Sequence, residues 1–467
     1  MKLQAKRLNS HSTYAVLLFL VISILEGTVF LTNVGALTLP DGDMHANASY
    51  AMATGQILNL PERSTDKFGN PVKSQHISGD SRYLHNKAMH NALVMDIIGD
   101  PMATDPHMAN QRLADHLPST RVTLPDKSFP SRTNQYFPLV YLPQGIGVWV
   151  GLHTGLGPYN VWQCGRIANF IFYLFLFGLS IVMIPRGKYL MAVLGSLYPT
   201  IFMATSLMSD AMFISVCACF IAYFFSLSTR DRPVTRVQMG ILIGLTVCLF
   251  LFKTVYVALA LLVWALPGSL LTTKRKATFT GLSALITLPI YGLWSSIYQN
   301  VPAIVSISDN THFMFRHPLK VIFTISWNLM EFPKTLMRIG SAVLVPTLFV
   351  LAAWLILFMS SRPAPVDQSS PTASVRRYRY IWVSMVAFFC VAFLAYLFPY
   401  LTWNDMTVMK NAQAIQGFQG RYLTPILPLL TCICFFPPER TADALPPHNA
   451  ADTIVGASEA ESSSPTR

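Results

Sequence analysis

Apolar runs long enough to cross a lipid bilayer recur along the chain. A membrane-spanning helix needs ~20 consecutive, mostly apolar residues, and the run at 14–36 already meets that length. Further runs follow at 160–184, 189–207, 209–228, 236–252, 254–271, 277–297, 337–360, 380–400 and 421–437. This spacing predicts an all-α polytopic membrane protein.

Composition excludes the soluble alternatives. Charged residues make up 12% of the 467 residues, whereas a soluble domain carries roughly 25%. So few charges leave too little polar surface for several soluble domains, and a disordered chain or a secreted disulfide scaffold is excluded as well. The seven cysteines lie in or beside apolar runs, which favours small core residues over metal ligands.

The basic residues predict how the chain is threaded through the membrane. The net charge is +12, and short cytoplasmic loops are enriched in Lys and Arg. Segment 137–155 is apolar but short, and several Pro and Gly residues interrupt it. If 137–155 is re-entrant or interfacial, the clusters at 186–188, 230–236, 274–276 and 362–379 all fall inside with the N-terminus. This predicts ten spans and two cytoplasmic termini in the plasma membrane, or eleven spans if 137–155 crosses.

The remaining segments complete the expected organisation. A cytoplasmic N-terminus covers 1–13, and the first span at 14–36 is favoured as a retained helix over a cleaved signal peptide because its core is long. A polar extracytoplasmic loop follows, in which 46–58 can form an interfacial amphipathic helix. That loop is 37–136, the bundle is 160–437 with outer loops at 299–336 and 402–420, and the predicted disordered tail is 438–467. Because most loop mass lies outside, we expect chemistry at the outer membrane surface.

The first candidate site follows the first span. Asp41, Asp43 and His45 alternate, so an extended segment would place all three on one side. Two carboxylates and an imidazole suit a general base or a divalent-cation site. The alternative is a solvated turn, because Pro-Asp-Gly is common turn chemistry.

Four more charged residues lie at the outer ends of predicted spans: Arg166, Asp210, Lys253 and Arg421. Charges this close to hydrocarbon are costly and often functional. The cations could instead extend to lipid headgroups, and Asp210 could simply cap a helix. Together, however, the cations can neutralise a lipid phosphate, and a neighbouring carboxylate can take a proton from a hydroxyl. This set is what a group transfer from a lipid-phosphate carrier requires.

Short motifs carrying these residues occur in order along the chain. The chain resembles the bacterial multi-span family called domain of unknown function 2142, which is related to the GT-C superfamily of membrane glycosyltransferases. The matching stretches are Pro40-Asp-Gly-Asp-Met-His45, Ala53-Thr-Gly55, Tyr136–Gly147, Gly165-Arg-Ile-Ala-Asn169, Tyr198–Asp210, Lys253-Thr-Val-Tyr256 and Gln419-Gly-Arg-Tyr-Leu-Thr-Pro425.

The resemblance implies a GT-C-like helical bundle that takes a polyprenyl-phosphate-linked sugar donor and an envelope glycan acceptor outside the membrane. It also implies an acidic general base just after the first span, a position that Asp41 matches. The family usually has Asp-Glu there, with His four residues after the Asp. This chain has Gly42 in place of the Glu and Asp43 one residue later, so either Asp43 replaces the missing carboxylate or the site is altered.

The first hypothesis is therefore a glycosyltransferase. Asp41 or Asp43 would be the catalytic base, while Arg166, Lys253 and Arg421 would bind the donor phosphate. Asp210 and His45 would orient substrate or a metal; a divalent cation stays open as a cofactor because GT-C relatives differ on it.

Two alternatives compete. A transporter or flippase of a lipid-linked or polar solute predicts charges deep in the bundle and short loops on both faces. A non-catalytic envelope-assembly protein would explain the missing Glu. No nucleic-acid partner is expected, because the basic residues belong to the inner loops.

Overall fold

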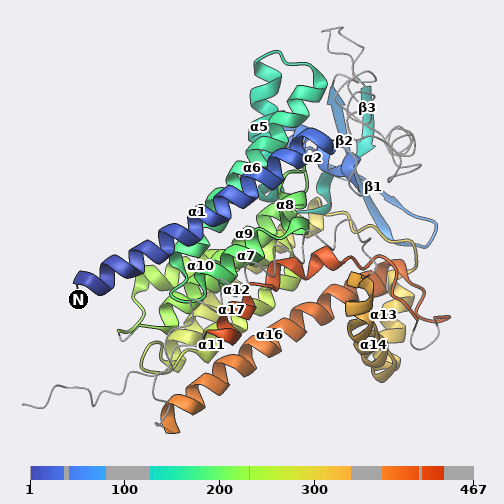
Figure 1. Ribbon diagram of the computed structural model, residues 1–467. Coiled ribbons are helices and arrows are strands. Elements are labelled where there is room, and N and C mark those ends of the chain that lie inside the picture. The colour runs from blue at the N-terminus through green and yellow to red at the C-terminus, as the bar shows by residue number, and fades with distance from the viewer. Residues whose placement is uncertain are drawn as a thin grey trace, which may run out of the picture.

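The computed structural model describes residues 2–35, 41–79, 127–131, 133–230, 232–337, 371–409 and 413–435. The predicted span at 337–360, apart from Met337, and the predicted tail at 438–467 lie outside the described residues. The described part is a bundle of helices with a small sheet at one end (Figure 1). We call this end the sheet end, and the opposite one, where the chain begins, the N-terminal end.

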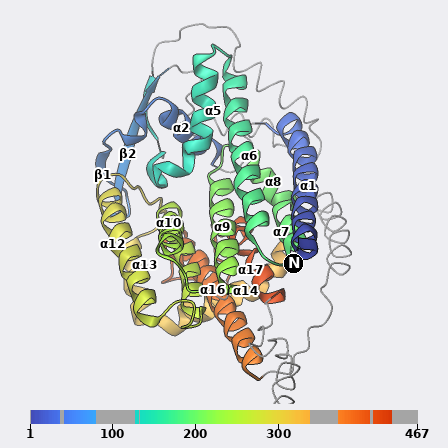
Figure 2. The same ribbon diagram turned by 90° about the vertical axis from the view of Figure 1, so that its left-hand side faces the viewer.

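The all-helical membrane class is confirmed by five long apolar helices among the described residues. Each is long and apolar enough to cross a membrane, and α9 is by far the most buried, with α1 and α12 on opposite sides of it (Figure 2). The count of ten spans stays a prediction. The five helices are α1 (Lys2–Asn33), α6 (Pro158–Met183), α9 (Asp210–Ser228), α12 (Thr273–Ile297) and α16 (Pro371–Trp403).

Other apolar runs are broken into shorter helices. The run at 189–207 forms α7 (Lys188–Gly195) and α8 (Tyr198–Ala204), because Pro199 has no N–H with which to continue a helix from α7. Prolines divide the run at 421–437 in the same way. Its pieces are η5 (Gly420–Tyr422), η6 (Thr424–Ile426) and α17 (Leu429–Cys434). Before them come α10 (Arg236–Phe252), η4 (Thr254–Ala260) and α11 (Leu261–Ala265).

Segment 137–155 forms η3 (Pro138–Tyr141) and α5 (Leu142–His153). Twelve helical residues extend only ~18 Å, well short of the ~30 Å hydrocarbon core. Instead α5 packs against α6: a Cβ added at Gly147 would lie 2.2 Å from the Cys164 carbonyl oxygen, and one at Gly151 would lie 2.9 Å from the Val161 Cα. The glycines that interrupt the apolar run are thus the residues that let two helix backbones approach closely.

The first polar loop contains structure that the sequence did not predict. A three-stranded antiparallel sheet is formed by β1 (Glu62–Thr65), β2 (Pro71–Gly79) and β3 (Lys127–Ser131), and η2 (Thr133–Gln135) follows it. Upstream, α2 (Gly42–Ala53) is buried along most of its length and packs against α5, and η1 (Gln56–Leu58) follows it. The helix expected to lie along the bilayer at 46–58 therefore begins earlier and forms part of the core.

The predicted outer loop at 299–336 is also largely helical. It forms α13 (Ile307–Arg316) and most of α14 (Pro318–Met337). Val321 and Ile325 of α14 form a second, smaller core with Tyr396 and Tyr400 of α16. These helices lie at the sheet end of the bundle (Figure 1).

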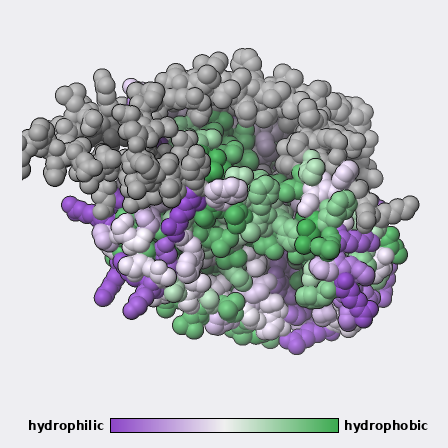
Figure 3. Space-filling model, turned by 90° about the horizontal axis from the view of Figure 1, so that it is seen from below, coloured by the Kyte–Doolittle hydropathy of each residue, from purple (hydrophilic) through white to green (hydrophobic). Residues whose placement is uncertain are grey.

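Basic residues gather at the N-terminal end. Arg379 Nη2 and Lys276 Nζ both donate to the Trp264 carbonyl, at 2.7 and 3.0 Å, and Val234 N donates to the Leu270 carbonyl at 2.9 Å. These contacts bring the N-terminal parts of α10, α12 and α16 to one end of the bundle. Seen from below, apolar side chains cover the middle of the molecule and hydrophilic ones gather toward both ends (Figure 3). This arrangement suits a membrane protein whose basic loops share one side.

Candidate functional site

A cavity of about 470 Å³ lies at the sheet end, between α12, α16, the junction of α10 with η4, and the segments at 135–137 and 417–422. Most of its lining is apolar, which we call the apolar wall, and three charged side chains also line it. The apolar wall includes Leu251, Val257, Leu394, Leu397, Phe398 and Leu401, and the charged residues are Asp41, Lys253 and Arg421.

Lys253 lies at the break between α10 and η4, where its extended backbone ends the helix. Its ammonium nitrogen is 3.8 Å from the ring centroid of Tyr422 and 5.4 Å from that of Phe213, in cation–π geometry. Burial lowers the pKa of Lys253 to about 8, although the nearby Asp210 carboxylate acts in the opposite direction. Within the described residues Lys253 makes no ion pair, so its charge faces aromatic rings and the cavity.

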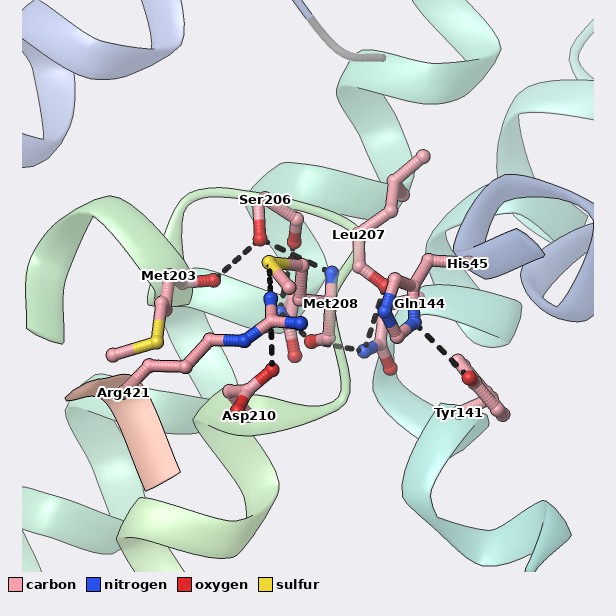
Figure 4. Close-up of polar contacts among 10 residues, drawn as sticks. His45, Tyr141, Gln144, Met203, Ser206, Leu207, Met208, Asp210 and Arg421 are labelled. Carbon is pink, nitrogen blue, oxygen red and sulfur yellow. Dashed lines mark hydrogen bonds and ion pairs between the residues drawn. The ribbon is translucent and has the colours of Figure 1, made fainter. Parts of the chain in front are cut away.

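Arg421 lies beside Asp210. Its Nη1 is 3.8 Å from Asp210 Oδ2 and 3.2 Å from Met208 Sδ, as Figure 4 shows. The two side chains are only 14% and 5% exposed. Among the described residues, neither Arg421 Nε nor Asp210 Oδ1 has a hydrogen-bond partner, although both are buried. Buried polar atoms are nearly always paired, so this pair has unused capacity to bind a polar group.

The turn that precedes Asp210 is held by two carboxamide side chains. Gln144 Nε2 donates to the Met208 carbonyl at 2.9 Å, and Asn169 Nδ2 donates to the Ser206 carbonyl at 2.8 Å (Figure 4 shows the Gln144 contact). Both amides are buried, Gln144 on α5 and Asn169 on α6. The sequence analysis did not identify these two residues as supports of the site. The signal that could have found them is an amide side chain within an otherwise apolar run.

Asp41 lines the cavity from the N-terminus of α2. Its backbone is left-handed, with φ 59° and ψ 26°, and no other non-glycine residue in the described ranges has a positive φ. This conformation is uncommon outside glycine, although Asp and Asn tolerate it best, and such strain clusters at functional sites. The predicted first-loop carboxylate is therefore brought to the same cavity as Lys253 and Arg421.

Asp41, Asp43 and His45 do not alternate along an extended segment. The chain is helical from Gly42, so the extended arrangement that would place all three on one side is not formed, and residues four apart share a helix face instead. His45 is buried, with Nδ1 3.0 Å from the Tyr141 hydroxyl and its ring stacked on Tyr136, which lines the cavity. His45 thus supports the cavity wall, and the side chain of Asp43 lies outside the described part of the structure.

Arg166 lies away from the cavity lining and is 1% exposed. Its guanidinium forms hydrogen bonds within the protein, mostly to backbone carbonyls in or just after α1 and just after α8. It donates to Thr205 O (2.7 Å), Val34 O (2.8 Å), Phe30 O (2.9 Å) and Gln163 Oε1 (3.2 Å). Of the seven predicted site residues, the structure brings Asp41, Asp210, Lys253 and Arg421 together and gives Arg166 different partners.

No group of three His, Cys, Asp or Glu side chains within the described ranges is placed to hold a metal ion.

A family model for predicted membrane proteins of domain of unknown function 2142 matches residues 18–430. The chain belongs to this family. The match runs from α1 to α17 and includes every residue of the cavity. No curated protein matches the chain, and no solved structure does.

Proposed function

We propose that this protein is a membrane glycosyltransferase that moves a sugar from a polyprenyl-phosphate carrier to an envelope acceptor on the outer side of the plasma membrane. The observation that carries the proposal is the pairing, in one cavity, of two cations with an apolar wall from α10, η4 and α16. A polyprenyl phosphate has the same two parts, an anionic phosphate and an isoprenoid chain.

The phosphate would be bound by Lys253 and Arg421. Both cations lie against the ring of Tyr422, at 3.8 and 5.7 Å from its centroid, so they share one small region of the cavity. A guanidinium binds two phosphate oxygens at once, and an ammonium adds a compact charge. Because the surroundings are largely apolar, their attraction to an anion is stronger than it would be in water.

The isoprenoid chain would lie along the apolar wall. A second, almost wholly apolar cavity of about 420 Å³ lies between α10, α11, α12 and α16, and it shares Val257 and Leu394 with the first. Together the two cavities extend the apolar surface beyond the charged residues, which line only the first cavity. Each buried CH₂ group contributes about 0.8 kcal/mol, so even part of such a chain adds substantial affinity.

Asp41 would act as the general base. The acceptor hydroxyl gives its proton to the carboxylate while its oxygen bonds to the anomeric carbon, and the bond from that carbon to the phosphate oxygen breaks. Lys253 and Arg421 stabilise the polyprenyl phosphate as it leaves. In this proposal the sheet end faces outward, both termini are cytoplasmic, and Asp43 stays the second candidate for the base.

The test is transfer of labelled sugar by the purified protein in lipid nanodiscs. A panel of polyprenyl-phosphate sugars is offered with an envelope glycan extract as acceptor, and wild type, Asp41→Asn and Asp43→Asn are compared. Asn tolerates the left-handed backbone at position 41, so the substitution removes the base and preserves the local fold. We expect Asp41→Asn to lower transfer about 100-fold or more while binding of the donor changes little.

Asp43→Asn tests the second candidate: with Asp41 as the base it keeps most of the activity, whereas a loss in Asp43→Asn alone would identify Asp43 as the base. Full transfer by Asp41→Asn would exclude that carboxylate as the base. Failure of the wild type to bind any polyprenyl phosphate would contradict the glycosyltransferase proposal as a whole.

A further inference from the structure

Four carboxamide side chains line the same cavity as the charged residues: Gln135, Gln299, Asn300 and Gln419. We call them the amide rim. They come from three segments that are distant in sequence: η2, the loop after α12, and the residues before η5. Gln419 is two residues from Arg421, so the rim begins next to the proposed phosphate position.

The rim is held in place by the protein itself. Asn134 Nδ2 donates to the Lys73 carbonyl at 2.9 Å and to the Tyr298 carbonyl at 2.6 Å. In turn, Asn300 N donates to the Asn134 carbonyl at 3.3 Å, and Lys73 N donates to Asn300 Oδ1 at 3.2 Å. These bonds join β2, η2 and the loop after α12, so the amides are positioned before a ligand arrives.

Most of the hydrogen-bonding capacity of the rim is unused. In the described part of the chain the side chains of Gln135 and Gln419 make no hydrogen bond, and Gln299 makes one long bond of 3.4 Å to the Gln135 carbonyl. Each amide can offer two donors and accept two hydrogen bonds. Trp294, which lines the same cavity, has a buried Nε1 without a hydrogen-bond partner among the described residues. Leaving such a donor unpaired costs free energy, which points to a polar group of a ligand.

We propose that the amide rim and Trp294 bind the sugar of the donor, and that this sugar is uncharged. The inference rests on the proposed function and names the substrate class of that site. Amides both donate to and accept from hydroxyl groups, and the Trp294 Nε1 can donate to one. Among the described lining residues, the cations are Lys253 and Arg421, which the phosphate occupies. The one carboxylate is Asp41, which the acceptor proton requires.

A charged sugar would lack a partner in the rim. The carboxylate of a uronic acid would be buried among neutral amides, and an ammonium group would compete for the carboxylate that acts as base. Burying an unpaired charge is far more costly than burying a hydroxyl that is hydrogen bonded. The rim therefore selects neutral sugars over acidic or basic ones.

The experiment measures binding of soluble donor analogues to the full-length protein in nanodiscs. The probes are farnesyl phosphodiesters carrying glucose, mannose, galactose or arabinose, and two that carry glucuronic acid or 4-amino-arabinose. Farnesyl methyl phosphate is the reference, because a methyl group replaces the sugar while the phosphodiester charge stays the same. The variants are Gln299→Ala and Gln419→Ala. Gln416→Ala is the matched control, since Gln416 is exposed and outside the cavity lining.

We expect at least one neutral-sugar probe to bind wild type at least tenfold more tightly than farnesyl methyl phosphate. Each rim variant should weaken that probe about three- to tenfold and leave the reference within about twofold, as loss of one or two hydrogen bonds predicts. Gln416→Ala should change neither.

Tighter binding of either charged sugar would overturn the inference, as would equal losses for the sugar probes and the reference, which would make the amides structural. Absence of any neutral-sugar preference over the reference would also overturn it while leaving the phosphate site standing. If the reference itself does not bind wild type, the proposed function fails and the inference fails with it.

Discussion

Two arginines, Arg166 fully buried and Arg421 largely so, lie beside the same turn, residues 205–208, and their surroundings differ. Arg166 donates to three backbone carbonyls and one side-chain oxygen at 2.7–3.2 Å. Arg421 has a carboxylate at 3.8 Å, a thioether sulfur at 3.2 Å and an Nε without a partner among the described residues, and it lines a cavity. Burial of a cation therefore says little about its role. A guanidinium saturated by carbonyls ties helices together, whereas one with unused donors at a cavity can bind an anion.

Arg166→Leu should have the largest effect on stability. It would leave the carbonyls of Phe30, Val34 and Thr205 buried without their donor, at a cost of about 3 kcal/mol or more. Thermal unfolding of the purified protein in detergent, followed by intrinsic fluorescence, measures this loss. A Tm equal to that of wild type would remove the structural role given to Arg166.

Arg421→Gln should instead affect binding. We expect at least a tenfold loss of affinity for farnesyl phosphate, because a charge-assisted contact is removed, with a much smaller fall in Tm than for Arg166→Leu. Since the substitution leaves Asp210 without its ion pair, the double variant Asp210→Asn/Arg421→Gln serves as the folded control. Wild-type affinity in both variants would exclude Arg421 from the phosphate site.

The role of Lys253 in phosphate binding can be tested by varying the pH. Its pKa is lowered to about 8 by burial, so its charge is present below that pH and is lost as pH rises through it. Affinity for farnesyl methyl phosphate should therefore fall about three- to tenfold between about pH 6.5 and pH 9.5. A bound phosphate favours the charged form and shifts the midpoint upward.

Lys253→Arg is the matched variant, because a guanidinium keeps its charge throughout that range. It should bind with little dependence on pH. A flat profile for wild type, or the same slope in both proteins, would show that the Lys253 ammonium does not contact the phosphate.

The sequence was sufficient for the parts of the fold that depend on local properties. Length and hydropathy predict α1, α6, α9, α12 and α16, because a span is a property of ~20 consecutive residues. The same local measure does not show that Pro199 separates α7 from α8. It also reads the glycines of α5 as interruptions, since the helix that packs against them is defined only in three dimensions.

For the site, the sequence by itself determined the inventory: Asp41, Asp210, Lys253 and Arg421 each follow or begin an apolar run, so all were expected near one membrane depth. Only the tertiary structure decided which of them meet and which similar residues do not. In sequence, Arg166 and His45 cannot be told apart from the residues that line the cavity. In the structure, however, Arg166 donates to backbone carbonyls and His45 forms a hydrogen bond with Tyr141. The amide rim joins segments more than a hundred residues apart, and in the sheet β3 pairs with β2, which ends far earlier in the chain. Hydrogen-bond saturation and enclosure depend on such distant partners, and no local pattern of residues encodes them.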